Sequence, residues 1–327
     1  MRDIRVATAQ FEHQNDDKAY NLGRIRSLTR RAVEQGAELA TFHECSLCGY
    51  TFLQHLDRAQ LGAVAEAVPD GPSTRALIAI AREFGIVVMA GLIERAGDRF
   101  HNCYVAAGPD GFLGSHRKLH TFINPHLSPG AHYTVLDLPG VKVGILTCYD
   151  NNLPENVRIT TLMGAEVIAM PHVTGCLPSV MPGRGTVERA LWENRERDPV
   201  RLRLEFQGPK GRGWLMRWLP ARAWENGIYV LFSNPIGLDD DTVKPGLAMV
   251  LDPFGEVLAE SQALGDDVVV ALLTAETLEQ SSGRRYLRAR RPDLYGALVA
   301  PPPPGEEPVT KPGWALAQEP DGRGKTD

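Results

Sequence analysis

Short apolar runs alternate with helical patterns along the first part of the chain. Apolar residues at every second position, or in an unbroken run, predict strands, whereas apolar residues three and four apart predict helices. In chain order these segments are a strand at 4–9, a helix through Leu22, Ile25, Leu28 and Val33, a strand at 38–42, a helix at about 73–84 and a strand at 86–90. This alternation is typical of an α/β sheet with parallel strands.

The middle of the chain contains a hairpin and a strand that leads into a cysteine. Strands at 101–107 and 112–116 flank the turn sequence Gly-Pro-Asp-Gly, which predicts a β-hairpin. The apolar run 141–147 then ends directly before Cys148. A helix is expected over 154–164, because this segment begins with proline and ends with glycine.

The second half repeats this mixture of elements. Further strands are predicted at 166–170, 228–232, 247–251 and 268–272, with a second hairpin turn at 252–255. Because each half holds strands, helices and one hairpin, the expected fold class is α/β, as a four-layer αββα sandwich of two mixed sheets covered by helices.

Residues 1–299 are treated as one domain. Within it, residues 177–213 mix proline, glycine and many charged residues over a length well above the about 4–6 residues of an ordinary connection. This segment predicts an insertion or lid that faces the substrate. The proline-rich residues 300–327 are expected to form an extended or mobile tail, since their composition builds a poor core.

Composition and charge narrow the classes of function. The 327 residues are 43% hydrophobic and 23% charged, as in an ordinary globular protein, with a net charge of −5 and a pI near 6.0. This balance favours a small-molecule substrate over nucleic acid or a membrane surface. The N-terminus lacks a signal-peptide pattern, so the five cysteines are interpreted as reduced thiols of a cytoplasmic protein.

Cys148 is a candidate nucleophile because it lies between an apolar strand and the start of a helix. Backbone N–H groups and the helix dipole at such a place stabilise a thiolate and an oxyanion. Free cysteine is also among the most buried residue types, so simple packing in the core is the competing interpretation. The position of Cys148 alone leaves both open.

Glu44 and Lys118 also follow predicted strands, at the ends where α/β sheets present reactive groups. With Cys148 they form a set that resembles the nitrilase superfamily of carbon–nitrogen hydrolases, over nearly the whole chain to about residue 295. The motifs that carry the resemblance are Thr41-Phe-His-Glu-Cys45, His116-Arg-Lys-Leu119 and Thr147-Cys-Tyr-Asp-Asn-Asn-Leu-Pro-Glu155.

The resemblance implies a Glu44–Lys118–Cys148 catalytic triad and a cytoplasmic homodimer or higher homo-oligomer. Glu44 would accept the thiol proton, and the Cys148 thiolate would attack an amide or nitrile carbon. Lys118 and the backbone N–H of Tyr149 would stabilise the oxyanion. The thioester would then be hydrolysed to a carboxylic acid, and this chemistry requires no metal or organic cofactor.

One loop departs from the family pattern, in which many members place a second glutamate between the lysine and the cysteine. Residues 121–130 here contain no acidic residue. Asn124 or His126 would then orient the substrate instead. The candidate substrate-binding residues are therefore Tyr50, Asn124, His126, Asn152, His172 and Arg184.

The substrate itself is expected to be a small amide or carbamoyl compound, giving an acid plus ammonia or amine. The residues after the cysteine, Tyr149-Asp150, are similar to those of amidase-like branches, whereas nitrilases proper tend to carry Trp-Glu there. A nitrilase acting on a nitrile, or a catalytically silent member of the same fold that only binds a ligand, remain the alternatives.

A zinc site is a further alternative. Cys45 and Cys48, together with His116 and His120, have the short internal spacings of tetrahedral zinc ligands. The two pairs lie far apart in the sequence, and the histidines bracket Lys118. The preferred interpretation is that they are pocket or core residues and that no metal is bound.

Overall fold

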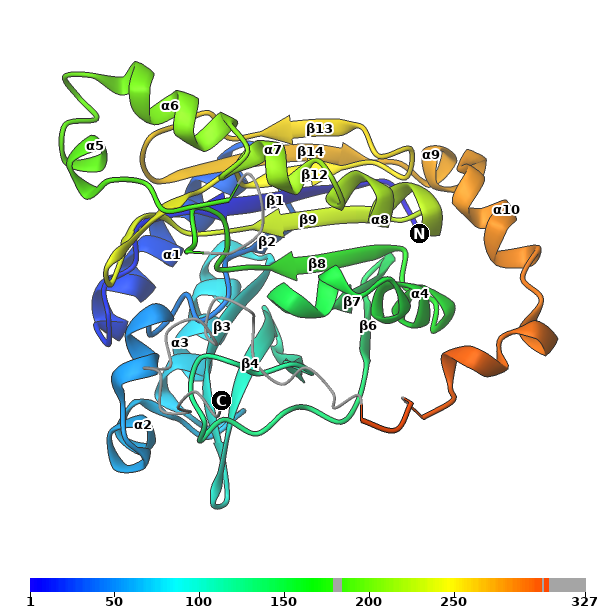
Figure 1. Cartoon of the computed structure of the whole chain (residues 1–327), viewed down its shortest axis with the longest axis horizontal. Coiled ribbons are helices and arrows are strands. Elements are labelled where there is room, and N and C mark those ends of the chain that lie inside the picture. Colours follow the sequence, from blue (N-terminus) through cyan, green and yellow to red (C-terminus); the bar gives the residue numbers. More distant parts are fainter. Residues whose placement is uncertain (179–183, 302, 306–327) are drawn as a thin grey trace, which may run out of the picture.

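Two six-stranded sheets lie one against the other at the centre of the protein (Figure 1). This computed structural model describes residues 1–178, 184–301 and 303–305. The first sheet has the order β14-β1-β2-β3-β4-β5, and the second has the order β13-β12-β9-β8-β7-β6. Both sheets are mixed, since β1-β2-β3 and β7-β8-β9 are parallel and their other neighbours are antiparallel.

The strand bounds agree closely with the apolar runs of the sequence. The first sheet contains β1 (Ile4–Gln10), β2 (Leu39–Thr41), β3 (Val87–Ala96), β4 (Arg99–Gly108), β5 (Gly111–Arg117) and β14 (Asp267–Leu273). The second contains β6 (Thr134–Leu138), β7 (Val141–Ile145), β8 (Val167–Pro171), β9 (Tyr229–Ser233), β12 (Met249–Leu251) and β13 (Val257–Glu260). Both predicted hairpins, β4–β5 and β12–β13, are present.

The central strands are apolar on both faces because each face meets a different core. Along β1, Val6 packs between the two sheets, whereas Ala7 packs beneath the helices. In β2, Leu39 likewise packs between the two sheets and Ala40 packs beneath the helices. Successive side chains of a strand point to opposite faces, so a strand buried on both sides must be apolar at nearly every position.

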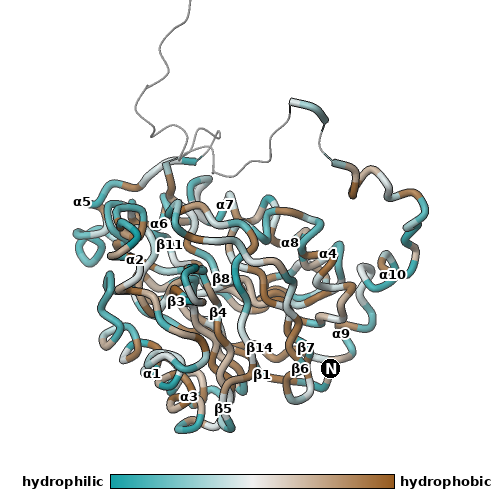
Figure 2. The backbone as a smooth tube through the Cα atoms, turned by 90° about the horizontal axis from the view of Figure 1, so that it is seen from below, coloured by the Kyte–Doolittle hydropathy of each residue, from teal (hydrophilic) through white to brown (hydrophobic). Residues whose placement is uncertain are grey.

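Helices cover the outer face of each sheet, which completes the predicted four-layer sandwich. The first sheet is covered by α1 (Lys18–Glu34) and α3 (Pro72–Phe84), and the second by α4 (Pro154–Leu162), α7 (Arg212–Leu215) and α8 (Leu219–Asn226). Figure 2 shows the apolar strands inside and polar residues on the outer helices. The remaining helical elements are η1 (Thr51–His55), α2 (Arg58–Val64), η2 (Cys148–Asn152), α9 (Ala275–Gln280), α10 (Ser282–Arg288), η3 (Pro292–Leu294) and η4 (Gly296–Leu298).

The 177–213 segment holds short helices rather than a bare loop. Residues 179–183 lie outside the described residues. The rest of the segment contains α5 (Arg189–Glu193) and α6 (Pro199–Gln207), and it ends within α7. Its apolar residues share a small core with a two-stranded sheet, β10 (Ile236–Asp239) and β11 (Thr242–Pro245). In Figure 1, α5 and α6 lie at the end of the molecule toward which β8 and β9 point.

Three strands were not expected from the sequence. The strand β6 has few buried residues, and the four-residue β10 and β11 are too short for an alternating pattern to stand out. Of the proposed tail at 300–327, residues 302 and 306–327 lie outside the described residues. Among the described residues, no helix is both long and apolar enough to cross a membrane.

Tyr104 joins strands of the first sheet through a buried hydroxyl. It donates to the carbonyl of Phe42 at 2.6 Å and lies 3.0 Å from the carbonyl oxygen of Met89. We expect Tyr104→Phe to lower the free energy of unfolding by about 1–3 kcal/mol, because buried polar groups would lose a partner. Urea denaturation measures this change. The exposed Tyr286→Phe is the control, and equal effects of both substitutions would contradict the expectation.

Candidate active site

Glu44, Lys118 and Cys148 all lie just beyond the C-terminal ends of strands. Glu44 follows β2, Lys118 follows β5, and Cys148 follows β7 in the other sheet. Chain segments far apart in the sequence therefore meet at one edge of the sandwich, which is where open α/β sheets bind ligands.

A buried ion pair is the centre of this site. Lys118 Nζ lies 2.6 Å from Glu44 Oε1, and Asn102 Nδ2 donates to the same oxygen at 2.6 Å. Glu44 is fully buried and Lys118 is only 1% exposed. Burial alone would lower the pKa of Lys118, but the negative charge of Glu44 raises it well above its usual value. Lys118 is therefore held as an ammonium.

The second oxygen of Glu44 is free to accept a proton. Among the described residues, Glu44 Oε2 is buried and has no hydrogen-bond partner. The negative charge of Glu44 acts on the Cys148 thiol and raises its pKa, which places the two side chains close to each other. The carboxylate thus has one oxygen committed to Lys118 and Asn102, and one available for proton transfer.

Close backbone contact fixes the turn that carries Glu44. Leu47 N donates to the carbonyl of Gly91 in β3 at 3.0 Å. A Cβ atom at position 91 would lie 2.3 Å from the backbone nitrogen of Cys45, so only glycine permits this approach. Cys45 itself adopts a positive φ of 49° in the same turn.

Cys148 begins the 3₁₀ helix η2 with a positive φ of 54° and is partly exposed. Removal from bulk water and the nearby charge of Glu44 raise the pKa of Cys148 to about 12, although Lys118 and the Val173 backbone act in the opposite direction. The resting nucleophile is therefore a thiol. Tyr149 is the next residue of η2, where a backbone N–H has no acceptor within the helix.

Asn151 and His172 hold the turn that carries Cys148 through hydrogen bonds. Asn151 Nδ2 donates to the carbonyl of Leu146 at 2.7 Å and to that of Cys148 at 3.2 Å. His172 Nε2 lies 3.2 Å from the same amide nitrogen, so it serves as an acceptor. Burial, together with the charge of Lys118, lowers the pKa of His172 to about 3, which keeps the ring neutral.

Asp150 connects the nucleophile turn to the lysine loop. Its carboxylate accepts hydrogen bonds from the backbone N–H of Leu119 at 3.1 Å and of His120 at 2.9 Å, and from His120 Nδ1 at 2.7 Å. Burial alone would raise the pKa of Asp150, but the nearby His116 and the hydrogen bond from His120 hold it well below its usual value. A single buried carboxylate thus sets the position of Lys118 relative to Cys148.

The candidate substrate-binding residues fall into different environments. Lys118 Nζ lies 5.4 Å from the centre of the Tyr50 ring, which places Tyr50 beside the ion pair. Asn124 is turned away from a substrate role, because its amide donates to the carbonyls of Leu53 at 2.7 Å and Leu56 at 2.8 Å and its oxygen accepts from His126 N at 2.8 Å.

His126 and Asn152 are partly exposed, and Asn152 contributes its carbonyl to Arg222 Nη2 at 2.8 Å. Arg184 stacks on Trp214 with its guanidinium carbon 4.0 Å from the ring centre. The contacts of Asn102 and Asp150 were not anticipated from the sequence. Only Asp150 had a signal there, since it stands two residues after the candidate nucleophile.

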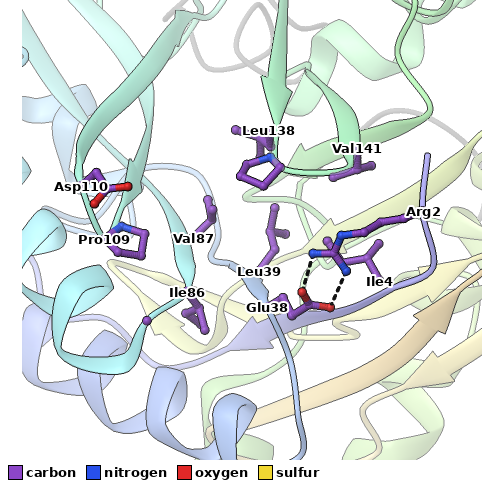
Figure 3. Close-up of a pocket in the computed structure, with 12 residues that line it drawn as sticks. Arg2, Ile4, Glu38, Leu39, Ile86, Val87, Pro109, Asp110, Leu138 and Val141 are labelled. Atoms are coloured by element: carbon purple, nitrogen blue, oxygen red, sulfur yellow. Dashed lines mark hydrogen bonds and ion pairs between the residues drawn. The ribbon is translucent and has the colours of Figure 1, made fainter.

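A separate cavity of about 220 Å³ lies at the other ends of the strands (Figure 3). It is lined by residues at the starts of β1, β2, β3 and β7, including Ile4, Leu39 and Val141, and by the ion pair between Arg2 and Glu38. Because Glu44 and Cys148 follow the opposite ends of these strands, this cavity belongs to a different edge of the sandwich.

The possible zinc ligands do not form a cluster. His120 and His116 both face Asp150, with His116 Nε2 at 3.8 Å from its carboxylate, whereas Cys45 and Cys48 belong to the apolar packing around Leu53 and Ile93. Within the ranges that the structure describes, no group of three or more His, Cys, Asp and Glu side chains is arranged to hold a metal ion.

Comparison with known proteins identifies the family. The family model described as carbon–nitrogen hydrolase matches residues 5–282. The chain belongs to this family. The match includes all three strand-end residues and runs from β1 to the start of α10.

Relatives within the family carry amidase and nitrilase names. An (R)-stereoselective amidase from Pseudomonas sp. is 31% identical over 91% of this chain and 96% of its own length. A nitrilase from Pyrococcus abyssi is 29% identical over 82% of this chain and 88% of its own length.

Solved structures show the same fold. The amidase from Nesterenkonia sp. AN1 in complex with acrylamide has a TM-score of 0.67 and 23% identity, covering 90% of this chain and 97% of that one. Another structure of that amidase carries the acetamide moiety of fluoroacetamide, covalently added at its active-site cysteine. The expected αββα architecture of this carbon–nitrogen hydrolase is confirmed.

Replacing Asp150 by Asn is expected to lower the free energy of unfolding by about 1.5–3 kcal/mol near neutral pH, because an amide cannot accept all of these hydrogen bonds. The native carboxylate has a lowered pKa, so its stabilisation is complete above the ordinary value of 3.8 and is lost as pH falls below it. The difference between the two proteins should therefore shrink in acid. Urea unfolding at several pH values tests this.

The control is Asp137→Asn, since Asp137 is 78% exposed beside Lys142 and should contribute little. A difference between wild type and Asp150→Asn that grows as the pH falls would contradict the assignment.

The raised pKa of Cys148 also has a direct spectroscopic consequence. Thiolates absorb in the ultraviolet and thiols do not, so wild-type protein minus Cys148→Ser should show no thiolate signal between about pH 6 and about pH 9, below the pKa of about 12. A difference signal fully developed at about pH 7 would mean that the resting nucleophile is a thiolate.

Proposed function

We propose that this carbon–nitrogen hydrolase cleaves small amides through a thioester on Cys148, with Glu44 as the general base and acid. The observation that carries the proposal is the buried Glu44–Lys118 pair at 2.6 Å, in which the second carboxylate oxygen has no hydrogen-bond partner among the described residues and the charge of Glu44 acts on the Cys148 thiol. A thiol nucleophile with a raised pKa needs an adjacent base, and Glu44 is placed to act as one.

In the first half of the reaction, Glu44 accepts the thiol proton while sulfur bonds to the amide carbon. The carbonyl oxygen becomes negative, and the Lys118 ammonium and the N–H of Tyr149 stabilise it. The C–N bond then breaks, and the leaving nitrogen takes the proton from Glu44. Ammonia or an amine departs, leaving an acyl thioester.

In the second half, a water oxygen attacks the thioester carbon while Glu44 accepts a proton from that water. The C–S bond breaks, the acid is released and sulfur regains the proton. One water is consumed, and an amide becomes a carboxylic acid plus ammonia or amine. The covalent acetamide adduct at the cysteine of the Nesterenkonia amidase supports a cysteine nucleophile in a protein of this fold.

An amide substrate is favoured over a nitrile by the residues that follow the nucleophile. Asp150 is used to hold the lysine loop, and Tyr149-Asp150 is the amidase-like pattern. The amidase names of the Pseudomonas and Nesterenkonia proteins support the same substrate class.

The test is ammonia release from a panel of aliphatic amides, N-carbamoyl compounds and the matching nitriles. Cys148→Ala, Glu44→Gln and Lys118→Met should each reduce kcat/KM for the best amide by at least about 1,000-fold, since these groups act as a unit. Cys103→Ala is the control, because Cys103 is a buried thiol of β4 outside the site.

Absence of hydrolysis across the whole panel would reject the proposed function. Faster turnover of a nitrile than of its amide would instead assign the protein to nitrile hydrolysis. Retention of activity in Cys148→Ala would exclude the thioester route.

A further inference from the structure

Two basic side chains at the site edge of the sandwich, the buried Lys244 and the partly buried Arg184, take no part in the proposed reaction. Lys244 is the third residue of β11, and Arg184 precedes α5 in the 177–213 insertion. Both come from segments that pack together around Cys176, Val243 and Phe206 at the site edge of the sandwich.

The amino group of Lys244 has no hydrogen-bond acceptor among the described residues. It is 0% exposed, and its nearest opposite charge is Asp239 Oδ2 at 3.8 Å, too long for a hydrogen bond. The Asp239 carboxylate is already used by His13 Nε2 at 3.1 Å and by the N–H and hydroxyl of Thr51 at 3.0 and 2.5 Å. The three N–H donors of Lys244 therefore remain available.

Arg184 also presents unused donors. Its guanidinium stacks on the face of Trp214 at 4.0 Å, which fixes the plane of the group. Nε and Nη2, the two nitrogens of one edge, are buried and have no acceptor among the described residues. This edge is the part of a guanidinium that binds a carboxylate through two parallel hydrogen bonds.

A series of contacts connects the Arg184 side of the site with the nucleophile. The rings of Trp214 and Trp218 lie 5.5 Å apart, and Trp218 lies 5.7 Å from His172, between ring centres. His172 in turn contacts Asn151, which binds the Cys148 carbonyl. Burial lowers the pKa of both Arg184 and Lys244, and a thiolate at Cys148 would raise both, so the two side chains lie within electrostatic reach of the nucleophile.

We propose that Arg184 and Lys244 bind a carboxylate of the substrate, so that the enzyme acts on small amides or carbamoyl compounds that carry a carboxylate group. Buried cations without acceptors are unfavourable, and a bound anion supplies both the charge and the acceptors that they lack. The nearby acid Glu205 is paired with Lys210 at 2.7 Å, and Asp239 with His13, so neither fills this role. The inference rests on the proposed amide hydrolysis and specifies its substrate class.

The carboxylate could belong to the acyl part of the substrate or to its leaving group, and pairs of substrates distinguish these two cases. A carboxylate on the acyl side is tested with glutaramate against glutaramide, which differ only in carboxylate against amide. A carboxylate on the leaving group is tested with N-carbamoylglycine against N-carbamoylglycinamide. We expect kcat/KM to favour the acid in one pair by about 10- to 100-fold, as for a charge-assisted hydrogen bond.

Arg184→Gln and Lys244→Met should each reduce that acid-to-neutral ratio about 10- to 100-fold, mainly through a higher KM for the acid. Arg195→Gln is the matched control, because Arg195 stacks on Trp192 at 3.9 Å in the same insertion and should leave the ratio unchanged. Binding of glutaramate to Cys148→Ala protein, with and without Arg184→Gln, gives a readout that does not depend on turnover.

Turnover of neutral amides without preference for the acid in either pair would overturn this inference while leaving the proposed function intact. Equal loss for acid and neutral substrates in both variants would also overturn it, since it would indicate a structural role. No hydrolysis of any amide would reject the proposed function itself.

Discussion

The buried pair of Glu44 and Lys118 sets the main physical constraint on this protein. Two charges removed from water are stable only when geometry and hydrogen bonds compensate for lost hydration. Here the compensation comes from a 2.6 Å contact and from Asn102 in the neighbouring strand β4. Both partners come from loops, so the strands beneath must hold those loops in fixed places. Gly91 and Asp150 serve that purpose from two directions.

The titratable groups of the site depend on one another for their charge states. Lys118 remains charged because Glu44 is close, and the neutral His172 leaves Lys118 without a second cation beside it. Cys148 remains protonated because burial and the negative charge of Glu44 both raise its pKa. Cys148 is therefore weakly nucleophilic until a bound substrate allows the proton to move to Glu44. This protects a partly exposed thiol from reaction with other electrophiles.

Much of the fold could be predicted from the sequence, because central strands that are buried on both faces, such as β1 and β3, appear in it as apolar runs. The αββα sandwich and both hairpins follow from those runs. Strand β6, half-buried at a sheet edge, and the short pair β10–β11 carry no such pattern and were missed. The strand-end positions of Glu44, Lys118 and Cys148 were predicted, and the structure brings these residues together.

The surroundings of the site were much less predictable. Asn124 was expected beside the substrate, but it is bonded to the carbonyls of Leu53 and Leu56. Asn102 and Lys244 gave no local signal, because their importance arises from neighbours that are distant in sequence. The apolar pattern of a single sequence shows which faces of an element are buried, but it does not show which buried polar atoms lack hydrogen-bond partners.

The two-sheet construction also has a mechanical meaning. Glu44 and Lys118 are fixed to the first sheet, whereas Cys148 is fixed to the second, and an apolar layer that includes Met89, Tyr104 and Ile145 separates them. The thickness of that layer determines the distance between base and nucleophile. Since a displacement of about 1 Å can slow a reaction greatly, the interior packing acts as a spacer in the catalytic geometry, and residues that never meet a substrate help to tune the rate.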